Sequence, residues 1–173
     1  MDGDGKLKID KSFDELLTKY FSDKDPNVAL YEKIPGISDI NLEAAYGIGY
    51  DLFQKKKYDK AHSIFYFLCI LNHFQKKYWK ALALTCYMMR KYEESRMMYF
   101  TAFMLDPTDI ELVSAMADCS VALGDADNAK TFFEITCEMG ENYGKNKRLC
   151  KRAKTILDVI NDLANNDPNT GKS

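Results

Sequence analysis

The stretch that decides the fold is KKYWKALALTCYMMRKYEESRMMYFTAFMLDPTD, residues 76–109, because its pattern recurs once before it and once after it. Small residues recur every 34 positions, at Gly49, Ala83 and Ala117. A second small column and an aromatic column keep the same period: Ala61, Ser95 and Ala129, then Phe65, Tyr99 and Phe133. Three columns that agree on one period indicate three tandem copies of one structural unit.

A 34-residue period is typical of the tetratricopeptide repeat, a pair of antiparallel helices in which small residues let the backbones approach. The middle copy resembles the consensus best, with Trp79, Tyr92 and the helix-ending Pro107. The outer copies depart from it, as terminal repeats commonly do. We therefore predict an all-α fold: three tandem tetratricopeptide repeats in a right-handed superhelical array, with an N-terminal helical segment and a C-terminal capping helix.

The sequence divides into five expected segments. They are a disordered tail (1–11), an N-terminal helical segment (12–37), three repeats (38–141), a capping helix (142–165) and a second disordered tail (166–173). Helix pairs are expected at 39–55 with 58–72, 76–90 with 92–105, and 109–123 with 126–140, followed by a last helix over 145–164. Gly49 within a helix costs about 1 kcal/mol relative to alanine, so we expect close packing to require it.

A short amphipathic helix is predicted over residues 13–21, capped by Ser12 with Glu15 completing a capping box. Its apolar face must dock on another surface. The face can fold back on the repeats or pair with a second subunit, and both outcomes are open. The residues predicted to dimerise are Phe13, Leu16, Leu17, Tyr20 and Phe21.

Charge and composition argue against nucleic-acid binding, membrane binding and a membrane-spanning protein. Lys and Arg total 24 against 26 Asp and Glu, for a net charge of -2, which favours neither nucleic acid nor an anionic membrane as a partner. The basic residues of the last helix are expected to form a solvated face. No apolar run approaches the roughly 18 residues of a membrane span, so we predict an unsecreted, soluble protein.

The cysteines and histidines predict neither a cofactor nor a metal site. The five cysteines are odd in number and lack Cys-x-x-Cys spacing, which favours reduced thiols. His62 and His73 are the only histidines, stand apart and have no paired cysteines nearby.

The first helix of each repeat carries the expected binding surface, because these helices line the concave side of such an array. Tyr46, Tyr50 and Phe53 form an aromatic ladder, more than the fold itself requires, which suits an extended peptide. The rings could instead pack against the N-terminal segment. The other groove residues expected from this geometry are Lys80, Leu84, Tyr87, Ser114, Asp118 and Val121.

Over roughly residues 28–163 the sequence resembles the tetratricopeptide chaperones of bacterial type III secretion, the class that escorts hydrophobic translocators. The resemblance rests on Ile34-Pro35-Gly36-Ile37-Ser38, Tyr50-Asp51-Leu52-Phe53, Tyr58-Asp59-Lys60-Ala61 and the run from Phe65 to Phe74. It implies a bacterial cytoplasmic chaperone whose concave groove holds an extended client segment. It also places His73 near the groove, although a loop histidine that merely ends the helix is the other interpretation.

No enzyme is predicted, since the sequence has no phosphate loop, metal spacing or nucleophile elbow. Two functions remain open. One is a chaperone that keeps a translocator, or a related substrate such as a gatekeeper, soluble and secretion-competent. The other is a general adaptor or regulatory protein that joins partners in a cytoplasmic complex.

Overall fold

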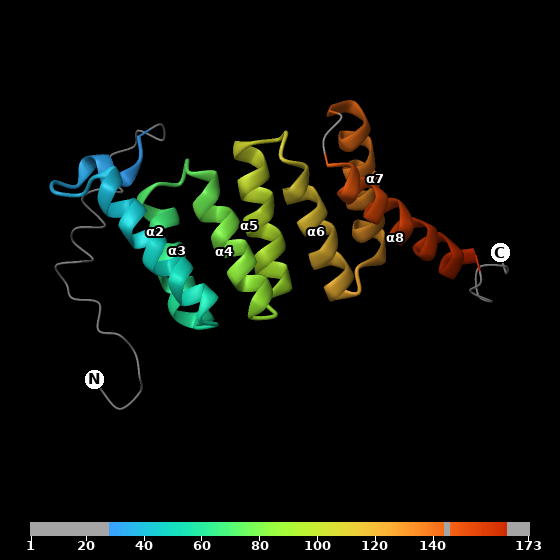
Figure 1. Ribbon diagram of the computed structural model, residues 1–173, viewed down its shortest axis with the longest axis horizontal. Helices are drawn as coiled ribbons and strands as arrows, with labels where there is room; N and C mark the ends of the chain where they lie inside the picture. The colour runs from blue at the N-terminus through green and yellow to red at the C-terminus, as the bar shows by residue number, and fades with distance from the viewer. Residues whose placement is uncertain (1–27, 144–145, 166–173) are drawn as a thin grey trace.

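The computed structural model describes residues 28–143 and 146–165, and within these ranges every regular element is a helix (Figure 1). A short 3-10 helix, η1 (Leu30–Lys33), comes first. The α-helices follow as α2 (Asp39–Gln54), α3 (Tyr58–Leu71), α4 (Lys76–Met88), α5 (Tyr92–Leu105), α6 (Ile110–Leu123), α7 (Ala126–Tyr143) and α8 (Lys147–Asn165). The predicted all-α fold is confirmed.

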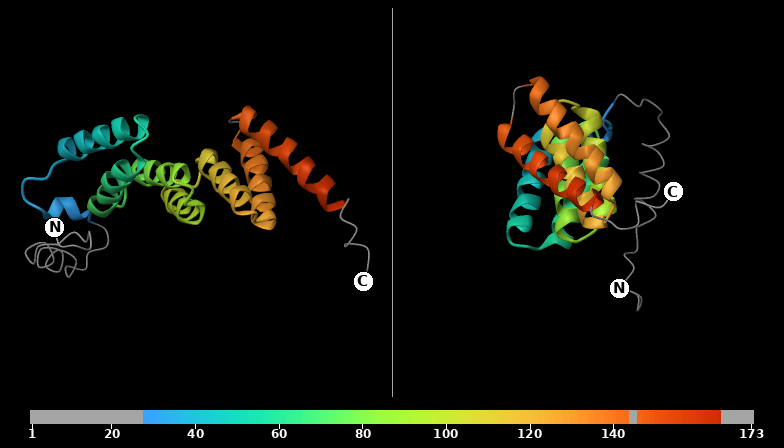
Figure 2. Two further views of the ribbon diagram at one scale, coloured as in Figure 1. Left: turned by 90° about the horizontal axis from the view of Figure 1, so that it is seen from below. Right: turned by 90° about the vertical axis from the view of Figure 1, so that its right-hand side faces the viewer.

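The helices form three antiparallel pairs that stand in a row, α2 with α3, α4 with α5 and α6 with α7 (Figures 1 and 2). Each pair also packs on the next through α3 with α4 and α5 with α6. The last helix, α8, packs on α7 and also touches α6. The predicted superhelical repeat array with a C-terminal capping helix is therefore confirmed.

The columns that set the period form the interior of the array. Phe65, Tyr99 and Phe133 are all buried, at 1%, 5% and 0% exposure. The small residues that face them are buried too, and Ser95 satisfies its hydroxyl by donating to the Ala83 carbonyl at 2.8 Å. Gly49 lies against α3 so closely that a β-carbon there would sit 2.7 Å from Cε1 of Phe65. The expectation that close packing requires this glycine is confirmed.

The turn inside each repeat uses one backbone conformation. Lys56, Arg90 and Gly124, again 34 residues apart, have positive φ values of 58°, 61° and 73°. Only the third copy places a glycine at this left-handed position, where a side chain is disfavoured. At Lys56 and Arg90 the repeat geometry therefore imposes a positive φ that these residues do not favour on their own.

The helix ends differ from expectation mainly at α7. This helix continues to Tyr143, past the expected end at 140, because Glu141 stands where the second repeat has Pro107 and so cannot stop the helix. Both tails and the predicted dimerisation helix with Phe13, Leu16, Leu17, Tyr20 and Phe21 lie outside the described residues and stay predictions.

Candidate functional site

The first helices α2, α4 and α6 present equivalent residues at 34-residue intervals, and we call the surface they form the first-helix face. It has three rows, taken from the fifth, ninth and twelfth position of each repeat. The rows are Tyr46, Lys80 and Ser114; Tyr50, Leu84 and Asp118; and Phe53, Tyr87 and Val121.

The ninth-position row supplies the most accessible apolar surface. Tyr50 is 52% exposed and Leu84 is 42% exposed, although both are large apolar side chains. Val121, from the twelfth row, is 52% exposed. Exposed side chains of this kind on neighbouring helices offer apolar contacts to a partner, and the tyrosine hydroxyl adds a hydrogen-bonding group.

Two residues of the twelfth row are engaged in holding their repeat together. The Phe53 ring packs edge-on against Tyr58, with centroids 5.4 Å apart, and Tyr87 packs the same way against Tyr92 at 5.2 Å. Each pair closes the turn between the two helices of one repeat. These rings are half-buried, so they contribute to the binding surface only in part.

The fifth-position row is more buried. Tyr46 is half-buried, and its ring lies 5.6 Å from Phe65 and 5.7 Å from Tyr78 of the core. The ammonium of Lys77 sits 5.2 Å from the Tyr46 ring centroid, a cation–π distance. Ser114 is only 4% exposed. A ligand would therefore reach one side of Tyr46 and little of Ser114.

Ion pairs run along the first-helix face from one repeat to the next. Lys77 of α4 pairs with Glu43 of α2, and Lys80 of α4 pairs with Glu111 of α6 at 2.7 Å. At the C-terminal end Arg152 of α8 donates to Asp118 at 3.1 Å. Asp118 is thus held by Arg152. The 34-residue interval between them was the sequence signal that could have identified this partner.

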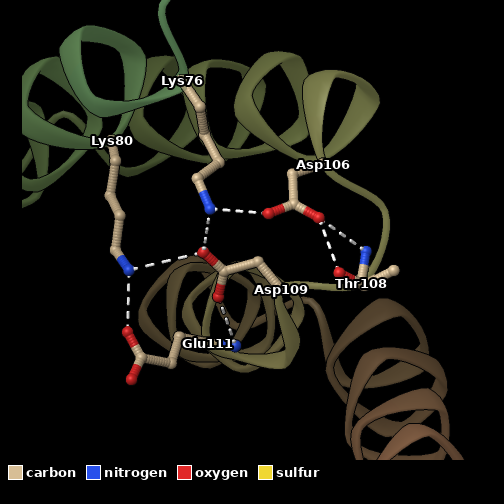
Figure 3. Close-up of polar contacts among 6 residues, drawn as sticks. All are labelled: Lys76, Lys80, Asp106, Thr108, Asp109 and Glu111. Atoms are coloured by element: carbon tan, nitrogen blue, oxygen red, sulfur yellow. Dashed lines mark hydrogen bonds and ion pairs between the residues drawn. The ribbon is translucent and has the colours of Figure 1, made fainter.

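A second polar network fixes α6 to α4 (Figure 3). Lys76 lies 2.7 Å from Asp106 and 2.9 Å from Asp109, and Lys80 lies 3.6 Å from Asp109. Asp109 caps α6 by accepting from the Glu111 backbone N–H at 3.1 Å. The Lys76 ammonium and the Thr108 hydroxyl and N–H lower the pKa of Asp106 to about 2. This network sets the position of the third repeat relative to the second.

A hollow of about 460 Å³ opens between α6 and α8 at the end of the first-helix face. Its lining combines apolar Ala115 and Leu149 with charged Glu111 and Arg152. The predicted groove residues Ser114 and Asp118 also line it. The capping helix therefore contributes side chains to the candidate site, which the sequence analysis did not anticipate.

His73 lies in the link between α3 and α4. Its ring contacts Phe74 with centroids 4.0 Å apart, and its carbonyl accepts from the Trp79 indole at 2.8 Å. These contacts close the link, which fits the interpretation of a loop histidine in place of proline. Its role near the groove stays a prediction.

Comparison with known proteins gives a consistent assignment. The tetratricopeptide repeat model matches residues 42–73 and 77–108. The chaperone protein SicA of Salmonella typhi is 25% identical over 114 residues, which cover 66% of this chain and 69% of SicA. The solved complex of PcrH with the chaperone-binding region of PopD is 26% identical, with a TM-score of 0.69, over 75% of this chain and 97% of PcrH. In sequence and in fold the chain is similar to the tetratricopeptide-repeat chaperones of type III secretion.

A further solved relative is SycD of Yersinia enterocolitica in complex with a peptide of the translocator YopD. SycD is 25% identical, with a TM-score of 0.67, over 73% of this chain and 96% of SycD. Among the residues that the structure describes, no helix is both long and apolar enough to cross a membrane.

Proposed function

We propose that this chaperone holds an extended segment of a hydrophobic translocator, or of a related export substrate such as a gatekeeper, on its first-helix face. Holding one segment keeps the client soluble and secretion-competent in the bacterial cytoplasm. The observation that carries the proposal is the match to PcrH and SycD, solved with the chaperone-binding region of PopD and a peptide of YopD, over nearly their whole length.

The spacing of the exposed residues suits an extended chain. The first helices α2 and α4 touch, and an extended peptide advances about 3.3 Å per residue, so one short extended segment can reach apolar positions of both helices. Tyr50 and Leu84 are the first two such positions, and the hollow between α6 and α8 is a third.

Binding of this kind is reversible and requires no covalent chemistry, so we propose that the protein is not an enzyme. Each half-exposed side chain covered by a client contributes about 1–2 kcal/mol. Several together reach micromolar to nanomolar affinity, from which an export machine can still strip the client. The ion pairs that flank the apolar row lock the repeats together and leave these side chains available.

The test compares two tyrosines of one repeat. Tyr50→Ala and Leu84→Ala should each weaken binding of a client peptide by about 5- to 30-fold, from 1–2 kcal/mol of lost contact. Tyr66→Ala is the matched control, since Tyr66 lies on the second helix α3 and is 55% exposed. Soluble yield of apolar secretion substrates co-expressed with each variant gives the second readout.

If Tyr66→Ala and Tyr50→Ala weaken client-peptide binding equally, in variants whose unfolding transitions match that of the unmodified chain, the binding surface does not lie on the first-helix face. Failure of the unmodified chaperone to solubilise any such substrate would replace the proposal with the adaptor function. An adaptor binds a folded surface or a chain terminus and has no need to rescue a partner's solubility.

A further inference from the structure

Three side chains with metal-binding chemistry meet at the joint between the first and second repeats. They are His62 of α3, Cys86 of α4 and Glu94 of α5. One imidazole nitrogen, the thiol sulfur and one carboxylate oxygen all lie within 4.8 Å of one another. The three residues come from three helices, so no sequence motif reveals them.

We propose that His62, Cys86 and Glu94 form a binding site for one zinc ion, with water or an external ligand in the fourth position. One sulfur, one nitrogen and one oxygen donor make a set that zinc accepts. Magnesium and calcium prefer oxygen donors alone, and copper(I) prefers softer sets than one with a carboxylate. Zinc bonds of about 2.0–2.3 Å place donor atoms roughly 3.5 Å apart, so donor atoms that lie within 4.8 Å need to approach by about 1.3 Å at most.

Exposure increases from Cys86 through His62 to Glu94, so an ion can enter from the solvent side. Cys86 is 1% exposed and forms the floor, His62 is half-buried, and Glu94 is exposed at the mouth. Neighbouring groups hold the two deeper ligands, Cys86 through its backbone and His62 through its ring. The Cys86 carbonyl accepts from the Lys91 N–H at 2.9 Å, and the His62 ring stacks on Tyr66 at an interplanar angle of 5°. Ligands on packed helices hold their geometry better than ligands on loops.

A metal ion entering this site would have to displace two groups, the Lys91 ammonium from Glu94 and the proton from the Cys86 thiol. Lys91 lies 3.4 Å from Glu94 in an exposed pair, which is a weak competitor for the carboxylate. Burial raises the pKa of Cys86 to about 11, so the thiol carries a proton that the metal replaces. Burial, together with the nearby Lys91 ammonium, lowers the pKa of His62.

A bound ion would join both repeats. Cys86 stands in the last turn of α4 and Glu94 in the first turn of α5, so the site lies at the edge of the array where these helices meet (Figure 1). His62 belongs to the preceding repeat. One ion would therefore fix the first repeat on the second, independently of the first-helix face and of the function proposed for it.

The experiment adds Co²⁺ alone to the reduced full-length chain and records absorption, then adds Zn²⁺ alone and follows thermal unfolding. We expect one Co²⁺ per chain, a thiolate-to-cobalt charge-transfer band with tetrahedral d–d bands, and a higher unfolding midpoint with Zn²⁺. Cys86→Ser should remove the band. Cys69→Ser, which changes another buried cysteine, should keep it.

Two further variants keep the test decisive if Cys86→Ser fails to fold. Glu94→Gln and His62→Gln alter side chains that are exposed or half-buried, so both should fold, and each should weaken Co²⁺ binding at least tenfold. A chain that gives no thiolate band overturns the proposal. So does a band that survives Cys86→Ser, or one that both the Glu94 and His62 variants leave unchanged.

Discussion

Replacing Gly49 and Gly47 separately by alanine measures how closely the two helices of the first repeat pack. Both glycines lie in α2, two residues apart, but only Gly49 faces α3. A β-carbon at Gly49 would lie 2.7 Å from Cε1 of Phe65 and 3.1 Å from Cγ2 of Ile64, whereas one at Gly47 would meet nothing within 4 Å. The pair therefore separates packing from helix propensity.

The expected magnitudes follow from these contacts. Alanine is preferred to glycine in a helix interior by about 1 kcal/mol, so Gly47→Ala should stabilise the chain by up to that amount. Gly49→Ala gains the same propensity but forces the Phe65 ring, 1% exposed, to move by nearly 1 Å from a core with no spare volume. Overpacking of this kind costs about 1–3 kcal/mol. The two variants should thus differ by about 1–3 kcal/mol.

Urea unfolding, monitored by the circular dichroism of the helices, compares the free energies of unfolding of the two variants. The dependence of that free energy on urea concentration must be the same in both. In a chain of this length each kcal/mol corresponds to about 2–4 °C in the melting temperature, so thermal scans provide an independent estimate. Equal stabilisation by the two substitutions would refute the argument that Gly49 is required by the α2–α3 contact. It would also leave the 34-residue column of small residues without its physical explanation at this position.

Three further perturbations test other parts of the array. Gly140→Ala should destabilise by about 1–3 kcal/mol, because its β-carbon would lie 1.8 Å from Sγ of Cys150, and Cys150→Ala in the same chain should recover most of the loss in urea unfolding. Arg90→Gly should stabilise by about 0.5–1 kcal/mol, since the backbone there has a φ of 61°, and no rise in the urea midpoint would contradict this. The depressed pKa of Asp106, about 2, means that its contribution is present above about pH 4 and disappears as the pH falls towards 2. Asp106→Asn should remove that part of the acid sensitivity, which is below about 1 kcal/mol because the pair with Lys76 is partly exposed.

The residues that recur every 34 positions could be predicted to lie in the core because the same local geometry occurs three times in the sequence. Gly49, Ala83 and Ala117 are small for the same reason, and a period found in sequence translates directly into helix pairs and their core. Helix ends were predictable where Pro107 or Gly124 marks them. The end of α7 was not, since Glu141 carries no stop signal and the helix continues to Tyr143.

Much of the candidate site could not be read from sequence, because it depends on contacts between helices. The positions of Tyr50 and Leu84 followed from the period, but their exposure did not. Arg152, the partner of Asp118, lies on the capping helix, and only the 34-residue interval between the two residues points to it. The cluster of His62, Cys86 and Glu94 forms only when three helices pack. Spacing rules for metal sites assume ligands on one or two local segments and miss such a group.

The rows of the first-helix face divide structural from binding roles by their distance from the turn inside each repeat. The twelfth position lies next to the turn, so Phe53 and Tyr87 find aromatic partners on the following helix and are held there. The ninth position lies one turn earlier, and its side chains Tyr50 and Leu84 are exposed. A repeat that must stay folded with or without its client needs this separation, because side chains that close the turn cannot also leave it to bind. Specificity for a client should therefore reside in the ninth row and in the hollow between α6 and α8, whereas changes at Phe53 and Tyr87 should act first on stability.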